Sequence, residues 1–98
     1  MSVKINKVTT QLAVDKLKDE ALVITMEECA ELSKECSKQF RQKGIRENII
    51  EEMADVLICI DYLSCMYDIT TEELQNIIDF KQTRTLERLQ NGTLTIRR

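Results

Sequence analysis

No proline interrupts this chain of 98 residues, and glycine occurs only twice. Because proline and glycine are the residues that most often end or bend helices, their scarcity favours long, uninterrupted helices. Along much of the sequence, apolar residues recur every three or four positions, which is the spacing of one helix face. The pattern predicts an all-α fold, a bundle of about four helices in a single domain over residues 1–98.

Breaks in the apolar pattern separate the four expected helices and a loose tail. These segments cover residues 3–18, 19–42, 47–67, 70–90 and 93–98. Asp19 is a suitable cap for the second helix, although Thr25 with Glu28 three residues later offers an alternative start. Thr70 and Glu73 have the same capping-box spacing at the start of the fourth helix. Gly44, between the second and third helices, is available for a left-handed helix cap.

Two helices carry the clearest signals for burial. A stripe on the second is expected to face the core and consists of Leu22, Met26, Cys29, Ser33, Cys36 and Phe40. The third is apolar on most of its faces, which is typical of the central helix of a bundle or of a dimer interface. Because a chain of this length has a thin core, we expect a second copy to complete the bundle as a homodimer.

Composition excludes several classes of protein. The net charge of −3 argues against binding to a nucleic-acid polymer, which normally requires a basic surface. We expect a soluble, cytoplasmic protein without a membrane partner, because there is no secretory signal and no apolar run long enough to span a bilayer. The chain has four cysteines and no histidine, so a zinc site built from these residues is not expected. We interpret the cysteines as reduced core residues, with disulfide or redox roles as the alternative.

Acidic residues form two matching groups on neighbouring helices. The second helix carries Glu27-Glu28-x-x-Glu31, and the third carries Glu51-Glu52-x-x-Asp55. Within each group, two acids lie three positions apart and share one side of the helix. These pairs are Glu28 with Glu31 and Glu52 with Asp55. If the short turn over residues 43–46 makes the two helices antiparallel, four carboxylates converge on one spot.

Four converging carboxylates repel one another, so either their pKa values rise or a divalent cation lies among them. Ligation by oxygen alone favours Mg²⁺, with Mn²⁺ as a substitute, and such sites accept substrate phosphates. The alternative is that the acids form solvated helix faces, with Lys34 and Lys38 paired to Glu31 and Glu35. Asp61 has no acidic partner one turn away, and we expect it to have a packing or dimer-contact role.

Basic residues share one face of the fourth helix. Lys81, Arg84 and Arg88 lie three and four residues apart there. Lysine and arginine both bind phosphate groups well. The alternative is an exposed basic face near a helix C-terminus, where the helix dipole favours positive charge.

The two acidic motifs give the chain a family resemblance. Glu27-Glu28-Cys29-Ala30-Glu31, followed by Glu51-Glu52-Met53-Ala54-Asp55, resembles the paired motif of the all-α nucleotide pyrophosphatases, and in particular the small MazG-like proteins. The likeness covers about residues 19–90. It implies a helical dimer or tetramer that binds Mg²⁺ through Glu28, Glu31, Glu52 and Asp55.

The resemblance also implies a reaction. The expected activity is hydrolysis of a nucleoside triphosphate, ribo or deoxy, to the monophosphate and pyrophosphate. The four metal-binding acids would then be catalytic, and Glu27 or Glu31 would orient the attacking water or take its proton. Two alternatives remain, a non-catalytic helical dimerisation module and a nucleotide-binding regulatory protein that has lost catalysis.

Overall fold

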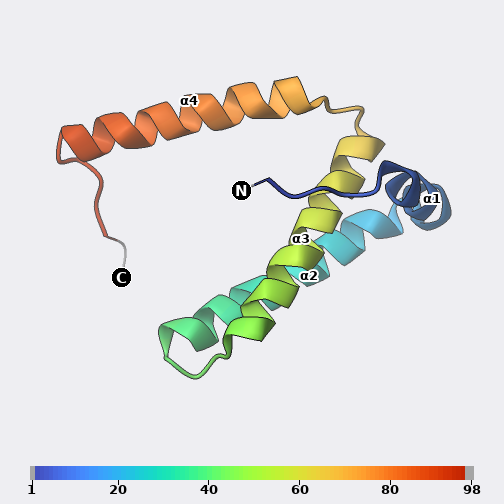
Figure 1. The fold of residues 1–98 in the computed structure, drawn as a ribbon, viewed down its shortest axis with the longest axis horizontal. Helices are drawn as coiled ribbons and strands as arrows, with labels where there is room; N and C mark the ends of the chain where they lie inside the picture. The colour runs from blue at the N-terminus through green and yellow to red at the C-terminus, as the bar shows by residue number, and fades with distance from the viewer. Residues whose placement is uncertain (1, 97–98) are drawn as a thin grey trace. The chain divides into compact units, whose positions relative to one another are not determined.

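The fold of this chain, in a computed structural model that describes residues 2–96, is all-α, as predicted. Figure 1 shows its four helices, which are α1 (Lys7–Leu17), α2 (Glu20–Phe40), α3 (Arg46–Met66) and α4 (Thr71–Gln90). The chain divides into two compact units, Met1–Asp68 and Ile69–Arg98, which are described separately below. The single domain over residues 1–98 stays a prediction.

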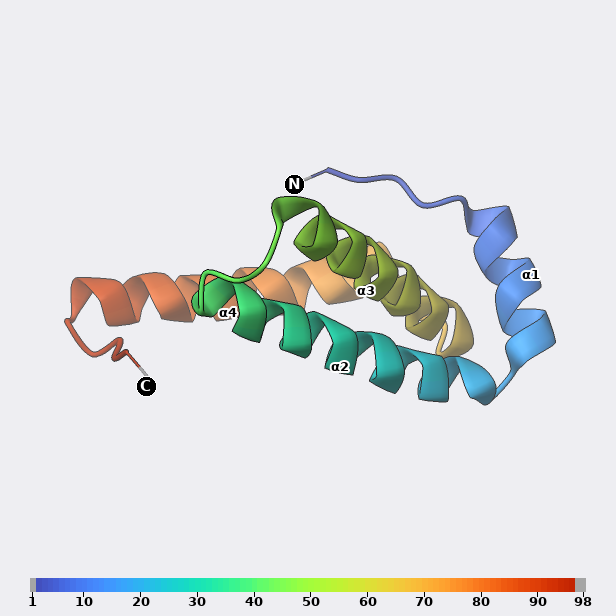
Figure 2. The same ribbon diagram turned by 90° about the horizontal axis from the view of Figure 1, so that it is seen from below.

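The first unit is built on a helical hairpin. α2 and α3 lie side by side and run in opposite directions, which both views of the ribbon make visible (Figures 1 and 2). α1 packs mainly against α3. The antiparallel arrangement expected from the short turn is therefore present, and it brings the two acidic motifs onto facing helices.

The first helix begins four residues later than expected. Asn6 is the N-cap of α1, and its side-chain oxygen accepts a hydrogen bond from the backbone N–H of Thr9 at 3.0 Å. The expected helical start at Val3 is therefore wrong, and residues 3–6 form a non-helical lead-in. At the other end, Lys18 has a positive φ of 51°, which interrupts the helical conformation between α1 and α2.

The start of α2 settles the choice between Asp19 and Thr25. Asp19 is the N-cap, although its side chain makes no capping hydrogen bond. Thr25 lies inside the helix, where its hydroxyl donates to the carbonyl of Ala21 at 2.8 Å. Thr25 is therefore not a cap, because its hydroxyl is used by the preceding turn of the same helix.

The turn between α2 and α3 uses its glycine for space. Gln42, rather than Gly44, adopts the left-handed conformation, with a φ of 58°. A Cβ at Gly44 would lie only 2.5 Å from the side-chain nitrogen of Gln39. That nitrogen donates to the carbonyl of Ile45 at 3.0 Å and to Glu35 Oε1 at 3.2 Å. Gly44 therefore lets a side chain of α2 hold the start of α3.

The buried face of α2 differs from the predicted stripe. Met26 is 65% exposed and Phe40 74% exposed, and Cys29, Ser33 and Cys36 are also exposed. The face turned inward instead carries Ala21, Glu28, Leu32 and Glu35. The two stripes lie on different sides of the same helix, and the side that carries Glu28 and Glu35 is the buried one.

The placement of the cysteines of α2 follows from which face of that helix is buried. All four cysteines are free thiols, in agreement with the prediction that they are reduced. Cys59 is buried and Cys65 is half-buried, whereas Cys29 and Cys36 are exposed. The expectation of a core position is thus wrong for the two cysteines of α2, which lie on its outward face.

The second unit consists of α4 and the segment after it. Both hydrogen bonds of the predicted capping box are present: Thr70 Oγ1 accepts from the N–H of Glu73, and the Glu73 carboxylate accepts from the N–H of Thr70, each at 3.1 Å. Gly92 follows the helix with a φ of 69°. Residues 93–96 have no regular structure, and the last two residues of the expected tail lie outside the described residues.

None of the four helices, within residues 2–96, combines the length and the apolar character that crossing a bilayer requires.

Candidate metal site and neighbouring pocket

Three carboxylates meet between α2 and α3. Glu28 on α2 and Glu52 and Asp55 on α3 each offer one oxygen, and these three oxygens lie within 4.8 Å of one another. Glu28 and Glu52 are half-buried, and Asp55 is exposed. The antiparallel hairpin places the middle of α2 opposite the start of α3, so three of the four predicted metal ligands come together.

The other two predicted site residues lie outside this cluster. Glu31 is exposed, and one of its oxygens lies 3.5 Å from the ammonium of Lys34, the pairing predicted from the sequence. Glu27 is also exposed and does not belong to the group of three. Spacing along the helix does not by itself exclude Glu31, because Glu52 and Asp55 are also three residues apart and both belong to the cluster.

The carboxylates raise one another's pKa. Partial burial raises the pKa of Glu28 above its ordinary 4.5, and the nearby charges of Asp55 and then Glu52 raise it further. Partial burial also raises the pKa of Glu52, with further contributions from Asp55 and Glu31. The cluster therefore holds more negative charge than its surroundings compensate.

One oxygen of the cluster has no partner. Glu52 Oε2 is shielded from solvent and accepts no hydrogen bond from the described part of the chain. A shielded carboxylate oxygen without a donor is unfavourable unless a cation or a water occupies the space beside it. An all-oxygen donor set with an orphaned oxygen fits a hard divalent cation such as Mg²⁺ or Mn²⁺.

Glu35 is an acidic neighbour that the sequence motifs did not single out. It is 5% exposed, and its negative charge contributes to the raised pKa of Glu52. Its hydrogen bond comes from Gln39, so the predicted ion pair with Lys38 is replaced by an amide contact. Glu35 follows Glu28 by seven residues, and seven residues bring a helix back to within about 20° of its starting direction. This spacing could have indicated that Glu35 faces the same side as Glu28.

The raised pKa values give a test of the cluster without any substrate. The folded protein binds protons at Glu28 and Glu52 more tightly than the unfolded chain does, so their contribution to stability is present below pH 4.5 and is lost as the pH rises through the raised values. We expect the melting temperature of EDTA-treated protein to fall over the pH interval that begins near 4.5 and extends through the raised pKa values. A melting temperature that is flat or rises over that interval would contradict the coupling described above.

The three predicted phosphate-binding cations lie on α4. Lys81, Arg84 and Arg88 are all exposed, and the guanidinium of Arg84 lies 5.9 Å from the centre of the Phe80 ring. None of the three forms an ion pair with an acidic residue among residues 2–96. They form an exposed basic face within the second unit.

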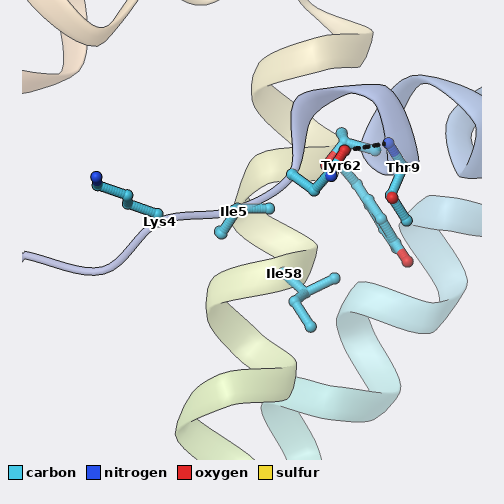
Figure 3. Close-up of a pocket in the computed structure, with 7 residues that line it drawn as sticks. Lys4, Ile5, Thr9, Ile58 and Tyr62 are labelled. Atoms are coloured by element: carbon cyan, nitrogen blue, oxygen red, sulfur yellow. Dashed lines mark hydrogen bonds between the residues drawn. The ribbon is translucent and has the colours of Figure 1, made fainter.

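A mainly apolar pocket lies beside α3 in the first unit. It has a volume of about 330 Å³ and is lined by Lys4, Ile5, Asn6, Thr9, Thr10, Ile58 and Tyr62. In Figure 3, Ile5, Ile58 and Tyr62 surround the opening, and the Lys4 side chain points away from Tyr62. Tyr62 follows Asp55 by two helical turns, or about 10 Å along the helix axis.

Comparisons with known proteins give no match: no family model, no curated protein and no solved structure is similar to this chain.

Proposed function

We propose that this protein is a Mg²⁺-dependent nucleotide pyrophosphohydrolase of the MazG-like kind. It would use one water to convert a nucleoside triphosphate into the monophosphate and pyrophosphate. The observation that carries the proposal is the meeting of Glu28, Glu52 and Asp55 between two antiparallel helices, with one oxygen of Glu52 left without a partner. The spacing of the two acidic motifs supports the same activity.

The acids have distinct roles in this proposal. Glu28, Glu52 and Asp55 would hold the cation. Glu31, which lies outside the cluster but whose charge contributes to the raised pKa of Glu52, would turn toward the cation as a fourth ligand. Bound Mg²⁺ supplies positive charge that stabilises the phosphate oxygens as the anhydride bond breaks. Glu27 or Glu31 orients the attacking water and accepts its proton, because the chain has no histidine to serve as a base.

Substrate binding would involve two further groups of residues. The chemistry of Lys81, Arg84 and Arg88 suits the oxygens of the triphosphate, since guanidinium and ammonium groups both pair well with phosphate. We propose this role from their residue types and their spacing within the second unit alone. The pocket at Tyr62 takes the nucleoside part, because its apolar wall suits a flat ring and its polar rim suits hydroxyl groups.

We further propose that the active protein is a homodimer or homotetramer in the cytoplasm. Many large apolar side chains remain exposed, and those on α4 include Leu74, Ile77, Ile78, Phe80, Leu86 and Leu89. Exposed apolar patches of this kind mark surfaces that associate with other proteins. The same observation favours the second candidate function, a helical association module without catalysis.

Pyrophosphate release tests the proposal. The purified chain is incubated with a panel of ribo-, deoxy- and base-modified nucleoside triphosphates, with Mg²⁺, with Mn²⁺ or with EDTA. We expect release of pyrophosphate and nucleoside monophosphate from at least one substrate, with loss of activity in EDTA. Release of orthophosphate instead, or no release from any substrate with either metal, would rule out the proposed reaction and leave the association module.

A further inference from the structure

A polar contact fastens α1 to α3 beside the pocket. Asp61 on α3 is only 7% exposed, and both of its carboxylate oxygens are used. The ammonium of Lys7 donates to Oδ1 and the hydroxyl of Thr10 donates to Oδ2. Lys7 and Thr10 lie one turn apart at the start of α1, so a single acidic side chain holds that turn of the helix. We call this contact the clasp.

The clasp and the pocket share structure. Thr10 belongs to both, and Asn6 and Thr9, which line the pocket, flank the clasp residues on the chain. On α3, the clasp residue Asp61 immediately precedes Tyr62. Moving the start of α1 away from α3 would therefore carry one wall of the pocket away from Tyr62 and Ile58.

Beyond the clasp, α1 is held to α3 by a weaker hydrogen bond, which the Cys65 thiol donates to Gln11 Oε1 at 3.3 Å. The apolar residues of α1 that are half-buried are Ala13, Val14 and Leu17. Thr10 is its one buried residue, and its large apolar residues Val8 and Leu12 are mostly exposed. A helix of eleven residues is not stable by itself, so its position depends on contacts with α3. Because the Lys7 side chain is 76% exposed, the ion pair can exchange with solvent, whereas an unpaired Asp61 would remain shielded and unfavourable.

We propose that the Lys7–Asp61–Thr10 clasp holds α1 closed over the pocket, and that Asp61 is a positioning residue for the ligand bound there. In the enzyme proposed above, on which the kinetic part of this inference rests, that ligand part is the nucleoside. The clasp lies about 9 Å along α3 from Asp55. Opening it should therefore weaken binding of substrate without disturbing the carboxylates that hold the cation.

The opening of the pocket is measured without any activity. The chain has two tyrosines and no tryptophan, so a Tyr67→Phe background leaves Tyr62 as the single fluorophore. In that background we expect Lys7→Met to increase quenching of Tyr62 by acrylamide, and Lys7→Arg, which keeps a cation, to restore the original quenching. Lys16→Met is the matched control, because Lys16 is an exposed lysine of α1 that makes no ion pair among the described residues. Unchanged quenching in Lys7→Met would overturn the clasp.

Kinetics then test the positioning role. If loss of the ion pair reduces the closed fraction to about one tenth, the KM for the nucleotide rises about tenfold. We expect this rise in Lys7→Met and in Asp61→Asn, with kcat kept and with recovery in Lys7→Arg. A KM that is unchanged, or a fall in kcat alone, would overturn the positioning role. If the wild-type protein hydrolyses no nucleotide, the enzyme proposal fails and the positioning of a nucleoside fails with it, while quenching still decides the clasp.

Discussion

Replacing Asp55 by asparagine is expected to lower pyrophosphate release by at least about 100-fold, since even groups that only support metal ligands typically contribute 10- to 100-fold. The same change should raise the melting temperature of the metal-free protein. Next to partial burial, the charge of Asp55 is the largest contribution to the raised pKa of both Glu28 and Glu52, and asparagine removes it. A loss of activity coupled to a gain in stability is the result that a metal-binding cluster predicts.

The matched control for that variant is Glu47→Gln. Glu47 is an exposed acid of the same helix, it does not belong to the cluster, and it makes no contribution to the pKa of either glutamate. Activity should stay at its original value in the control, and the melting temperature should fall slightly rather than rise, because the charge of Glu47 lies in the first turn of α3 and favours the helix there. If Asp55→Asn kept full turnover, the assignment of the metal site to these residues would be wrong. If it lost activity by unfolding, the melting temperature would fall instead of rising.

Addition of Mg²⁺ or Mn²⁺ to the metal-free protein should raise its melting temperature. A ligand at 100 times its Kd adds about 2.7 kcal/mol to the free energy of unfolding. In a domain of this length, that gain corresponds to a shift of roughly 10–20 °C. The physical reason is that the cation neutralises the repulsion among the three carboxylates and gives Glu52 Oε2 the partner that it otherwise lacks.

EDTA should reverse the shift, and Asp55→Asn should reduce it. KCl and NaCl at the same ionic strength provide the control, because general screening of surface charge does not depend on a built site. A shift of the same size in the wild-type protein and in Asp55→Asn would show that the cation binds elsewhere. No shift in either would support the helical association module, in which the acids are solvated.

Much of the fold could be predicted from the sequence because the signals are local. The capping box at Thr70 is decided within four residues, and its hydrogen bonds are the ones predicted. The predicted start of α1 was wrong because Val3 also fits a helical spacing. The helix begins after Asn6, whose side chain caps it. Periodicity cannot separate such alternatives when the cap is a single side chain.

The larger error was in predicting which face of α2 is buried, and it also affected the candidate site. Two stripes are present on that helix, and hydrophobicity favoured the one with Met26 and Phe40. The structure instead turns Glu28 and Glu35 inward, which no rule based on apolar residues selects. Convergence of Glu28 with the acids of α3 followed from the antiparallel hairpin alone. The Asp61 clasp depends on where α1 docks, so local patterns did not indicate it.

The Gly44 turn, in which Gln39 reaches across to the carbonyl of Ile45, has a consequence for how the molecule folds. It joins the two acidic motifs through a short connection, so the candidate site is formed by residues 28–55 alone. Closing so short a stretch of chain has a low entropic cost, and contacts between near neighbours in sequence form early and rapidly. We expect the hairpin to form early in folding, so that the proposed cation site is complete as soon as α2 and α3 have paired.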